Sequence, residues 1–538
     1  MSTPRNRREL LQGLGAAGLV GGATAALGGT TLAAGSLVTR ALAAGASPGS
    51  LAAGAAAGQP RRGGRIRVAG MAASTADTLD PAKGTLSTDY IRHYMLYSGL
   101  TRLRQDLRTE LALAESIESD DQRVWRIKLR SGVLFHDGRP LTSADVVFSL
   151  RRHSIAATAS KIKAIIDQFE SVEARGPLDV RLTLRGPNAD LPAILAVSHA
   201  VIVPDGTTDF SRGIGTGAYR LREFKPGVRT LVERNPDYWR DGRPWLDEIE
   251  LIGIPDELAR VNALLSGDVQ LTIALDARST RRVSASPGHA IHVTRSGLYT
   301  NLILRADQRP TSSPDFVRAM QYLMDRPTMA RALYRGYATI ANDQPIPPEH
   351  PYYNPDIPQR QYDPDRARFH LKRAGLLGIR LPLYASQVAN QSVEMAGMLQ
   401  QSAATIGLNL AVNRVPADSY WSSHWFKHPA TFGNSNPRPT ADLLFSTLFQ
   451  SSAPWNESGW RNERFDSLLV AARGEGDESL RREMYGEMQL LVHEHCGMGI
   501  PVFIPMIDGY DRRIRGFGSL PIGGLMGYQF AEHVWWAG

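Results

Sequence analysis

The sequence predicts an α/β protein of two or more domains. Its 538 residues exceed what a single hydrophobic core usually holds. Apolar and polar residues alternate over 65–69 and 180–184, as they do in half-buried strands. Helical patterns that begin at capping residues stand between and after these strands, so both kinds of element share the chain.

The composition is that of a soluble globular protein, with 43% hydrophobic and 21% charged residues. The net charge is +8, but the first 60 residues hold four arginines against one glutamate. Without a long basic block, the sequence gives little support to nucleic-acid binding. The single cysteine, Cys496, excludes an internal disulfide. No segment after the leader is long and apolar enough to cross a membrane.

Residues 1–45 are typical of a twin-arginine signal peptide. Arg7 and Arg8 precede two leucines and a weakly apolar stretch at 13–38, rich in glycine and alanine. Ala41-Leu42-Ala43 predicts cleavage near Ala43 and a periplasmic protein. No cysteine follows, so a lipoprotein is not expected. Residues 46–62 are expected to be an Ala/Gly-rich disordered linker. The alternative for the leader is a disordered Ala/Gly tail, which needs no paired arginines.

Three enzyme-like patterns lack the context that their chemistry requires. GxGxxG at 13–18 and GxSxG at 45–49 lie in the leader, away from any strand-to-helix turn. Gly213, Gly215 and Ala218 are followed by a strand, so a pyrophosphate would meet no helix N-terminus. No Ser-His-Asp, zinc or P-loop pattern is found, and neither a cofactor nor a catalytic residue is expected.

Residues 129–150 read LRSGVLFHDGRPLTSADVVFSL. Val133-Leu134-Phe135 predicts a strand, Asp137-Gly138 a tight turn, and Thr142 or Ser143 the cap of a helix. This string closely resembles the signature of bacterial extracellular solute-binding proteins of the peptide/nickel type, the receptors of ABC importers. Further matches are Leu79-Asp80-Pro81, Gly215-Thr216-Gly217-Ala218-Tyr219, Asn235-Pro236-Asp237-Tyr238-Trp239 and Val317-Arg318-Ala319-Met320 with Asp325-Arg326.

The resemblance covers nearly the whole mature chain and implies a two-lobed periplasmic-binding-protein fold, with mixed sheets flanked by helices. Lobe I would comprise 63–296, with an inserted subdomain at about 105–205. Lobe II would comprise 297–501, and 502–538 would return to lobe I. A solute would be held in the interlobe cleft and favour hinge closure. The implied partners are the permease and ATPase of an inner-membrane importer, and a monomer is expected.

The resemblance also points to one loop as a contact for the solute. Family members that bind short peptides place an aspartate there against the peptide's ammonium group. The matching loop, 432–442, has no acid in its first half. Asn434 and Asn436 can accept hydrogen bonds, and Arg438 offers a fork suited to carboxylate or phosphate. The alternative is that an acid elsewhere binds the ammonium group.

Dipeptide-binding members also carry an Arg-Pro-Tyr where this chain has Ser386-Gln387-Val388. Both anchors of a dipeptide therefore differ, which favours another solute. Aromatic residues near the loop could line the cleft or pack in an interface or core. The further candidate solute contacts are Tyr299, Asn301, Ser386, Gln387, Tyr420, Trp421, Trp425, Trp455 and Asn456.

Histidines offer a weaker metal interpretation. His493 and Cys496 could share a helix face, and His424 and His428 could form a pair, but structural metal sites need more ligands. No metal is expected.

The sequence therefore predicts a non-enzymatic receptor of peptides or peptide-like solutes. The alternatives are a receptor for a glycoside, another polar organic molecule or a metal chelate, and, less favoured, a secreted hydrolase. The test that separates the hydrolase is whether a serine, cysteine or carboxylate pair in the cleft has a base within reach; none is expected.

Overall fold

The computed structural model describes residues 59–537. The predicted signal peptide, its cleavage site and most of the linker lie outside the described residues. Across 59–537, no helix combines the length and the apolar character that a membrane span requires.

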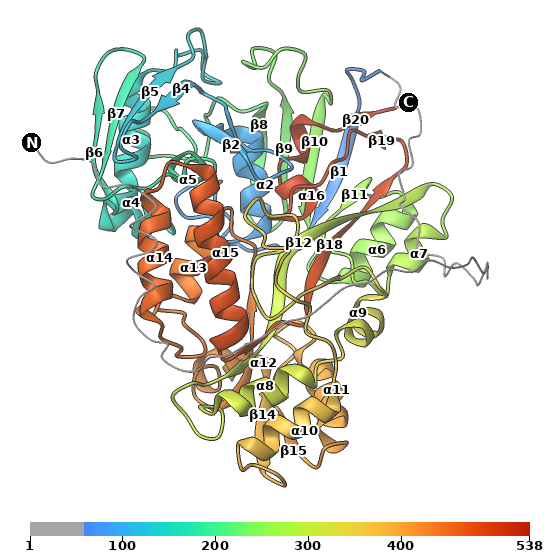
Figure 1. Cartoon of the computed structure of the whole chain (residues 1–538). Coiled ribbons are helices and arrows are strands. Elements are labelled where there is room, and N and C mark those ends of the chain that lie inside the picture. Colours follow the sequence, from blue (N-terminus) through green and yellow to red (C-terminus); the bar gives the residue numbers. More distant parts are fainter. Residues whose placement is uncertain (1–58, 538) are drawn as a thin grey trace, which may run out of the picture. The chain divides into compact units, whose positions relative to one another are not determined.

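One large mixed sheet runs through the described chain in the order β15-β14-β16-β12-β18-β11-β1-β10-β9-β8 (Figure 1). Two short strands join it, β13 beside β18 and β17 beside β12. The strands are β1 Arg65–Gly70, β8 Tyr219–Lys225, β9 Arg229–Arg234, β10 Glu248–Gly253, β11 Leu271–Thr272, β12 His289–Leu304, β13 Thr339–Ile340, β14 Arg380–Ala385, β15 Asn409–Arg414, β16 Ala430–Ser435, β17 Met498–Gly499 and β18 Val502–Asp511.

The first half of the fold is built on β1 and β8–β11. The predicted alternation of β1 is confirmed, because Ile66 and Val68 are buried while Arg65 and Arg67 pair with Glu250. β1 lies parallel to both β10 and β11. The associated elements are α2 Ser87–Leu96, α6 Glu257–Ser266, α7 Thr280–Ser284, α16 Gly524–Gly527, η3 Phe530–Glu532, β19 Ile514–Arg515 and β20 Trp535–Trp536.

A four-stranded antiparallel sheet, β4-β5-β7-β6, forms a separate layer of the first half around its own core. The predicted strand at 180–184 is confirmed as β7. The elements are β4 Ala114–Glu118, β5 Val124–Leu129, β6 Phe169–Ala174, β7 Asp179–Leu184, α3 Ser143–Arg151, η1 Arg152–Ser154, η2 Ala156–Thr158, α4 Lys163–Ile166 and α5 Leu191–Ile194, with the hairpin β2 Thr101–Leu103 and β3 Thr109–Leu111 beside them.

The second half contains β14, β15 and β16, with β14 parallel to both neighbours. Its helices begin at the predicted caps: Ser313, Asp325 and Asp363 each accept a backbone N–H from the first turn. Three further helices pack around a second core. The helices are α8 Pro314–Tyr322, α9 Arg326–Tyr334, α10 Pro364–Arg373, α11 Ser392–Ala404, α12 Ala417–Ser423, α13 Ala441–Leu448, α14 Glu463–Gly474 and α15 Glu478–His495.

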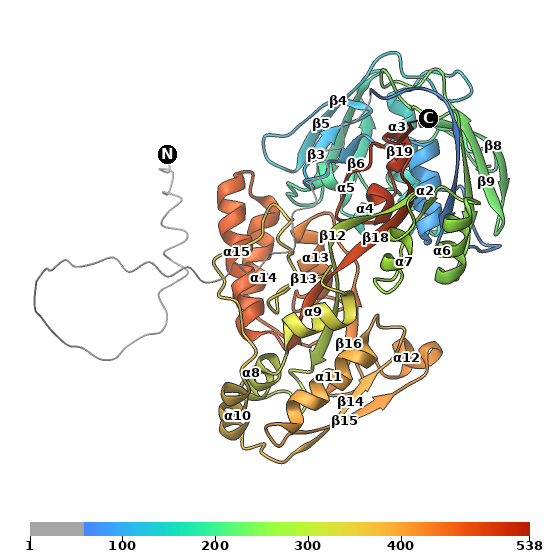
Figure 2. The same ribbon diagram turned by 90° about the vertical axis from the view of Figure 1, so that its right-hand side faces the viewer.

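Two long antiparallel strands, β12 and β18, join the halves and lie side by side in both views (Figures 1 and 2). Their register shifts between Thr294 and Leu298. Before this irregularity β12 pairs with β18 alone, and after it β12 also pairs with β16 of the second half. On this pairing we propose lobe I as 63–296 with a subdomain at about 105–205, lobe II as 297–501, and a return to lobe I over 502–538.

The stretch at 129–150 differs from its prediction in one respect. Val133-Leu134-Phe135 is not a strand, because only an isolated bridge joins Leu134 to Pro140 across the tight turn. The helix is confirmed: α3 begins after Thr142, whose side chain and that of Asp145 form a reciprocal cap.

His136 of this stretch clamps the Gly-Thr-Gly segment. Its backbone N–H donates to the carbonyl of Gly215 (2.8 Å), and its Nδ1 accepts the N–H of Gly215 (3.2 Å). Nε2 therefore carries the proton and donates to the carbonyl of Gly217 (3.0 Å). Gly217 in turn donates to the carbonyl of Leu96 at the end of α2 (3.0 Å). Two family motifs far apart in the sequence thus meet at one helix end.

Candidate functional site

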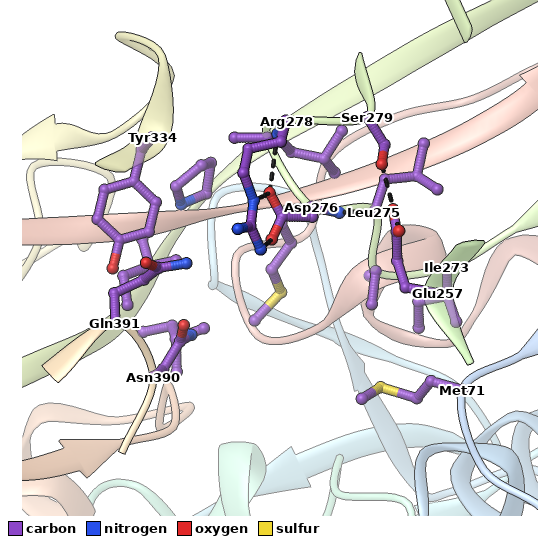
Figure 3. Close-up of a pocket in the computed structure, with 18 of the residues that line it drawn as sticks. Met71, Glu257, Ile273, Leu275, Asp276, Arg278, Ser279, Tyr334, Asn390 and Gln391 are labelled. Atoms are coloured by element: carbon purple, nitrogen blue, oxygen red, sulfur yellow. Dashed lines mark hydrogen bonds and ion pairs between the residues drawn. The ribbon is translucent and has the colours of Figure 1, made fainter. Parts of the chain in front are cut away.

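A cavity of about 690 Å³ opens between the two halves (Figure 3). We call it the interlobe cavity. Its wall combines residues from the first half, from the joining strands and from the second half. They are Met71, Glu257, Leu258, Arg260, 273–279, Gly524 and Tyr528; Leu298 and 504–507; and Leu333, Tyr334, Asn390, Gln391 and Asn436.

The cavity forms where parallel strands end. In the first half, Met71 follows β1, Glu257 follows β10, and 273–279 follow β11. In the second half, Asn390 follows β14 and Asn436 follows β16. Ligands of open α/β sheets bind outside the carboxyl ends of the strands. Both halves therefore present to this cavity the edges that commonly hold a ligand.

Hydrogen bonds hold the charged side chains of the first-half wall in place. Glu257 accepts the backbone N–H of Asp276 (3.1 Å) and the hydroxyl of Ser279 (3.2 Å). Arg278 donates to both oxygens of Asp276, at 2.9 and 2.7 Å (Figure 3). Burial raises the pKa of Asp276, but the hydrogen bonds from Arg278 lower it by more, so its net pKa lies below the ordinary value. Asp276 is therefore ionised at neutral pH.

Arg260 fixes the backbone beneath this wall. Its side chain is buried and donates to four carbonyls, those of Ile254 (2.8 Å), Pro255 (2.9 Å), Ala274 (2.9 Å) and Ile273 (3.2 Å). These carbonyls belong to the segments after β10 and β11. One cation thus joins the two loops that supply most of the first-half wall.

The second-half wall supplies amides and a tyrosine. Tyr334 ends α9, and Asn390 and Gln391 precede α11 (Figure 3). The backbone carbonyl of Asn390 accepts the hydroxyl of Thr300 in β12 (2.7 Å), which holds this loop against the joining strand. The side chains of Asn390, Gln391 and Asn436 add hydrogen-bond donors and acceptors to a largely apolar cavity.

Backbone strain gathers at the interlobe cavity. Ala274, Gln391 and Tyr528 line it with φ of 57°, 59° and 70°. Leu525 and Met526, which precede Tyr528 in a left-handed turn, have φ of 52° and 57°. The left-handed conformation costs roughly 1–2 kcal/mol for each non-glycine residue. Such strain clusters at ligand sites, so this wall has the character of a functional surface.

The predicted loop reaches the cavity at one residue. Asn436 lines it, Asn434 lies within β16 opposite Thr300, and Arg438 lies further along toward α13. The Arg438 guanidinium lies 5.9 Å from the ring of Trp455, which is 46% exposed. The structure therefore brings Arg438 and Trp455 together, while Asn436 lines the cavity.

Asn301 and Trp425 converge on an acid that sequence reasoning missed. Asn301 Nδ2 donates to Glu457 Oε2 (2.8 Å), and Trp425 Nε1 donates to Glu457 Oε1 (2.9 Å). Within 59–537 no cation pairs with Glu457, and burial raises its pKa to about 7. A side chain at Gly433 would overlap the Glu457 carboxylate. The glycine inside a strand pattern was the available signal of this close approach.

The remaining predicted contacts are placed as follows. Tyr420 lies in the core, where its hydroxyl bonds both the N–H (2.9 Å) and the carbonyl (2.5 Å) of Phe432. Trp421 packs edge to face on Trp425, with ring centroids 5.3 Å apart. Asn456 donates to the carbonyls of Gln450 (3.3 Å) and Trp460 (2.6 Å). Tyr299 and Ser386 are buried with hydroxyls that have no partner within 59–537, and Gln387 is exposed.

The histidines considered as metal ligands have other partners. His424 Nδ1 lies 3.2 Å from His428 Nε2, and both rings stack on Tyr384. His493 Nδ1 donates to the carbonyl of Asn342 (2.7 Å). Among the residues that the structure describes, no group of three or more His, Cys, Asp or Glu side chains is arranged to hold a metal.

One expectation is wrong. A serine of the cavity does have a potential base within reach, because Ser279 donates to Glu257 at 3.2 Å. The contact arises because Ser279 precedes α7 and faces the first turn of α6. Glu257 also accepts the backbone N–H of Asp276, and no third side chain of residues 59–537 orients the pair as a triad would require.

The unfolding of an E457Q variant should depend on pH differently from that of the wild type. A raised carboxyl pKa stabilises the fold below the ordinary pKa, and this contribution is lost as pH rises to about 7. The free energy of unfolding of the wild type relative to E457Q should therefore fall by about 3 kcal/mol between pH 4.5 and 7. Denaturant unfolding at several pH values checks this, and a difference independent of pH would contradict it.

Comparison with known proteins places these features in a family. The model of bacterial extracellular solute-binding proteins, family 5 (Middle), matches residues 108–457. The glutathione-binding protein GsiB of Escherichia coli K12 is 26% identical over 470 residues, which cover 83% of this chain and 91% of GsiB.

Solved structures share the fold. DppA of Helicobacter pylori, in complex with the peptide STSA, aligns with a TM-score of 0.73 at 22% identity, over 89% of this chain and 99% of DppA. AppA of Bacillus subtilis, in complex with a nonapeptide, aligns with a TM-score of 0.71 at 22% identity, over 89% of this chain and 100% of AppA. NikZ of Campylobacter jejuni, in complex with Ni(L-His), aligns with a TM-score of 0.72 at 21% identity, over 87% of this chain and 99% of NikZ.

Proposed function

Since the chain belongs to the family 5 bacterial extracellular solute-binding proteins, receptors of ABC importers, we propose that it captures a peptide-like solute in the interlobe cavity. It would deliver that solute to a membrane permease and its ATPase. The single observation that carries the proposal is the cavity itself, to which both halves contribute the carboxyl ends of parallel strands.

The chemistry of the cavity suits a peptide better than a sugar or an ion. Its volume of about 690 Å³ lies within the usual range of small-molecule sites. Apolar walls at Leu298, Leu333 and Ile504 suit side chains, and the amides of Asn390, Gln391 and Asn436 suit peptide groups. The names of relatives agree with this choice, since GsiB is a glutathione-binding protein and DppA was solved with a peptide.

Native mass spectrometry of protein purified from its host tests the proposal. A bound peptide or peptide derivative is the expected result. A bound glycoside or metal chelate would identify a different solute for the same receptor.

We further propose that the protein has no catalytic activity. Among the described residues of the cavity, the Ser279–Glu257 contact is the arrangement that would suggest a hydrolase, but Glu257 also accepts the backbone N–H of Asp276 and so serves to hold the wall together. Incubation with a bound solute should return that solute unchanged. A product formed by the wild type and absent in S279A would establish a hydrolase instead.

We propose closure of the halves onto the solute, and a buried ion pair between them supports this. Arg481 of α15 donates to Asp190 before α5 (2.5 Å), and both side chains are only 9% exposed. Arg481 also donates to the hydroxyl of Tyr352 (3.0 Å). Beside this pair, the N–H of Ala189 donates to the carbonyl of Arg473 (2.8 Å). These bonds join the subdomain to helices of the second half.

An R481Q variant should therefore favour the open arrangement. Losing one partner of a buried pair costs about 2–5 kcal/mol, since Asp190 would stay buried without its cation. Faster hydrogen exchange at 187–193 and weaker solute binding are the expected results. R482Q on the same helix is the control, because Arg482 is 46% exposed. Equal exchange in both variants would show that the pair does not hold the halves together.

We also propose that the leader directs twin-arginine export, with cleavage near Ala43, to give a soluble periplasmic monomer. Replacing Arg7 and Arg8 with lysine should retain the precursor in the cytoplasm, as seen by fractionation and mass measurement. Unchanged export would point to another route.

A further inference from the structure

Arg438 lies in a loop whose neighbouring residues line two cavities at the interface of the halves. Two residues before it, Asn436 lines the interlobe cavity. Immediately after it, Pro439 lines a smaller cavity of about 300 Å³, to which Asp190 of the first half and Arg481 of the second half also contribute. The loop from β16 to α13 therefore runs along the interface, with Arg438 at its middle.

The buried arginines of the described chain have partners, and Arg438, which is partly buried, can be compared with them. Arg92 pairs with Asp77 and Asp89, Arg152 with Asp80, Arg326 and Arg360 with Asp343, and Arg481 with Asp190. Arg260 has no acid, but four carbonyls accept its protons. These arrangements follow the rule that a buried cation is paired or fully hydrogen-bonded.

Arg438 has neither kind of partner. Its Nε is buried without a hydrogen bond, and no carboxylate of residues 59–537 forms an ion pair with it. Burial lowers its pKa, and the groups that offset this are hydroxyls, those of Tyr299 and Tyr90, rather than acids. The guanidinium is thus a partly buried cation that lacks an anionic partner among the described residues.

The tyrosines near Arg438 come from both halves. Tyr299 belongs to β12, where it lies opposite Ser435 of β16, and its hydroxyl is buried. Tyr90 belongs to α2 and packs on Tyr528, with ring centroids 5.5 Å apart. Tyr528 lines the interlobe cavity. Phenol and guanidinium groups can all donate hydrogen bonds, so an anion is the group that would satisfy them together.

We infer that Arg438, with Tyr299 and Tyr90, forms a subsite for an anionic group of the solute, namely a carboxylate of the proposed peptide. This inference rests on the proposed function and makes it more specific. The loop would bind the acidic end of the solute, opposite in charge to the ammonium group expected there from the family resemblance. Because Tyr90 and Arg438 belong to different halves, the carboxylate would also favour closure.

Binding of matched peptides tests the subsite. The probe is a mixed-sequence pool of synthetic di- to pentapeptides, prepared once with free C-terminal carboxylates and once as C-terminal amides. Bound species are measured by native mass spectrometry, and affinities of the retained peptides by calorimetry. The wild type should prefer the free acids. R438Q should weaken their binding roughly 10- to 100-fold, the loss typical of a hydrogen bond to a charged group, and leave the amides unchanged.

Two further variants separate binding from folding. R438K should keep part of the preference, because it retains the charge but loses the fork. R366Q on α10, where Arg366 is 67% exposed, should change nothing. R438Q should melt no lower than the wild type, since it removes a partly buried cation that has no anionic partner within 59–537.

The outcomes are distinguishable. Equal binding of acids and amides by the wild type, or equal losses for both in R438Q, would overturn the subsite and leave the peptide receptor standing. Binding of no peptide in either form would overturn both.

Discussion

An Asp343→Asn variant is expected to lose about 3–5 kcal/mol of unfolding free energy, the cost of breaking a buried ion pair. Asp343 is fully buried in the second half, where one carboxylate oxygen holds Arg326 (2.6 Å) and also Arg360. Its other oxygen accepts the N–H of Ile500 next to β18 (2.9 Å). The variant would leave Arg326 buried without its anion, and Arg360 with only the longer contact to Glu494 at 3.7 Å.

Replacement by asparagine removes the charge without adding backbone strain. Asp343 has a φ of 55°, a conformation that asparagine tolerates well. Asp356→Asn on the same loop is the control: Asp356 is exposed, and its loss should change stability by less than about 0.5 kcal/mol. Denaturant unfolding measures both. A loss below about 1 kcal/mol for D343N would mean that the arginines find other partners.

The stability of the wild type relative to D343N should also depend on pH. Burial raises the pKa of Asp343, but Arg326 and Arg360 lower it by more, so its net pKa lies below the ordinary value. A lowered carboxyl pKa stabilises the fold above the ordinary value, and the contribution is lost as pH falls through the lowered pKa. The stability gap between the wild type and D343N should stay constant near neutrality and narrow in acid.

A Gly217→Ala variant is expected to lose about 3 kcal/mol or more, at the upper end of what overpacking costs. A side chain at 217 would overlap the backbone of Met95 and Leu96, and one at Gly215 would overlap the carbonyl of Leu96. Backbone atoms at the end of a buried helix cannot move aside as a flexible side chain can. The helix α2 would have to shift, and the His136 clamp would be lost.

Gly186→Ala is the matched control in the same half. No atom lies within 4 Å of a side chain built there, and its backbone conformation is an ordinary one. Its stability should be unchanged within about 0.5 kcal/mol. If G217A and G186A have the same melting temperature, α2 is free to move and its close packing against Gly217 does not determine stability.

Particular elements show what local sequence patterns could predict. Helices α8, α9 and α10 begin at Ser313, Asp325 and Asp363, because a short polar side chain followed by proline sets a helix start within a few residues. β1 and β7 follow from their alternation. The expected strand at 133–135 is absent because the chain turns back so soon that only one isolated bridge, Leu134 to Pro140, can form. An apolar run in the sequence does not show how many bridges will form.

The candidate site was predicted less completely. Of the contacts proposed from the sequence, the loop residue Asn436 lines the cavity, while Asn301 of β12 and Trp425 hold Glu457. Most of the wall follows strands β10, β11 and β14, which the sequence patterns do not predict. Once those strands are known, Glu257, Asp276 and Asn390 can be identified, because ligands of open α/β sheets bind outside the carboxyl ends of the strands.

Motifs, caps and alternation act over a few neighbouring residues, so the amino-acid sequence alone is enough to predict the family, the mixture of strands and capped helices, and a loop with Arg438 and no acid in its first half. The three-dimensional packing is needed to show which segments line the interlobe cavity, that Asp190 meets Arg481, and that Arg438 has no anionic partner within 59–537. Those facts depend on contacts between residues hundreds of positions apart, for which no local period exists.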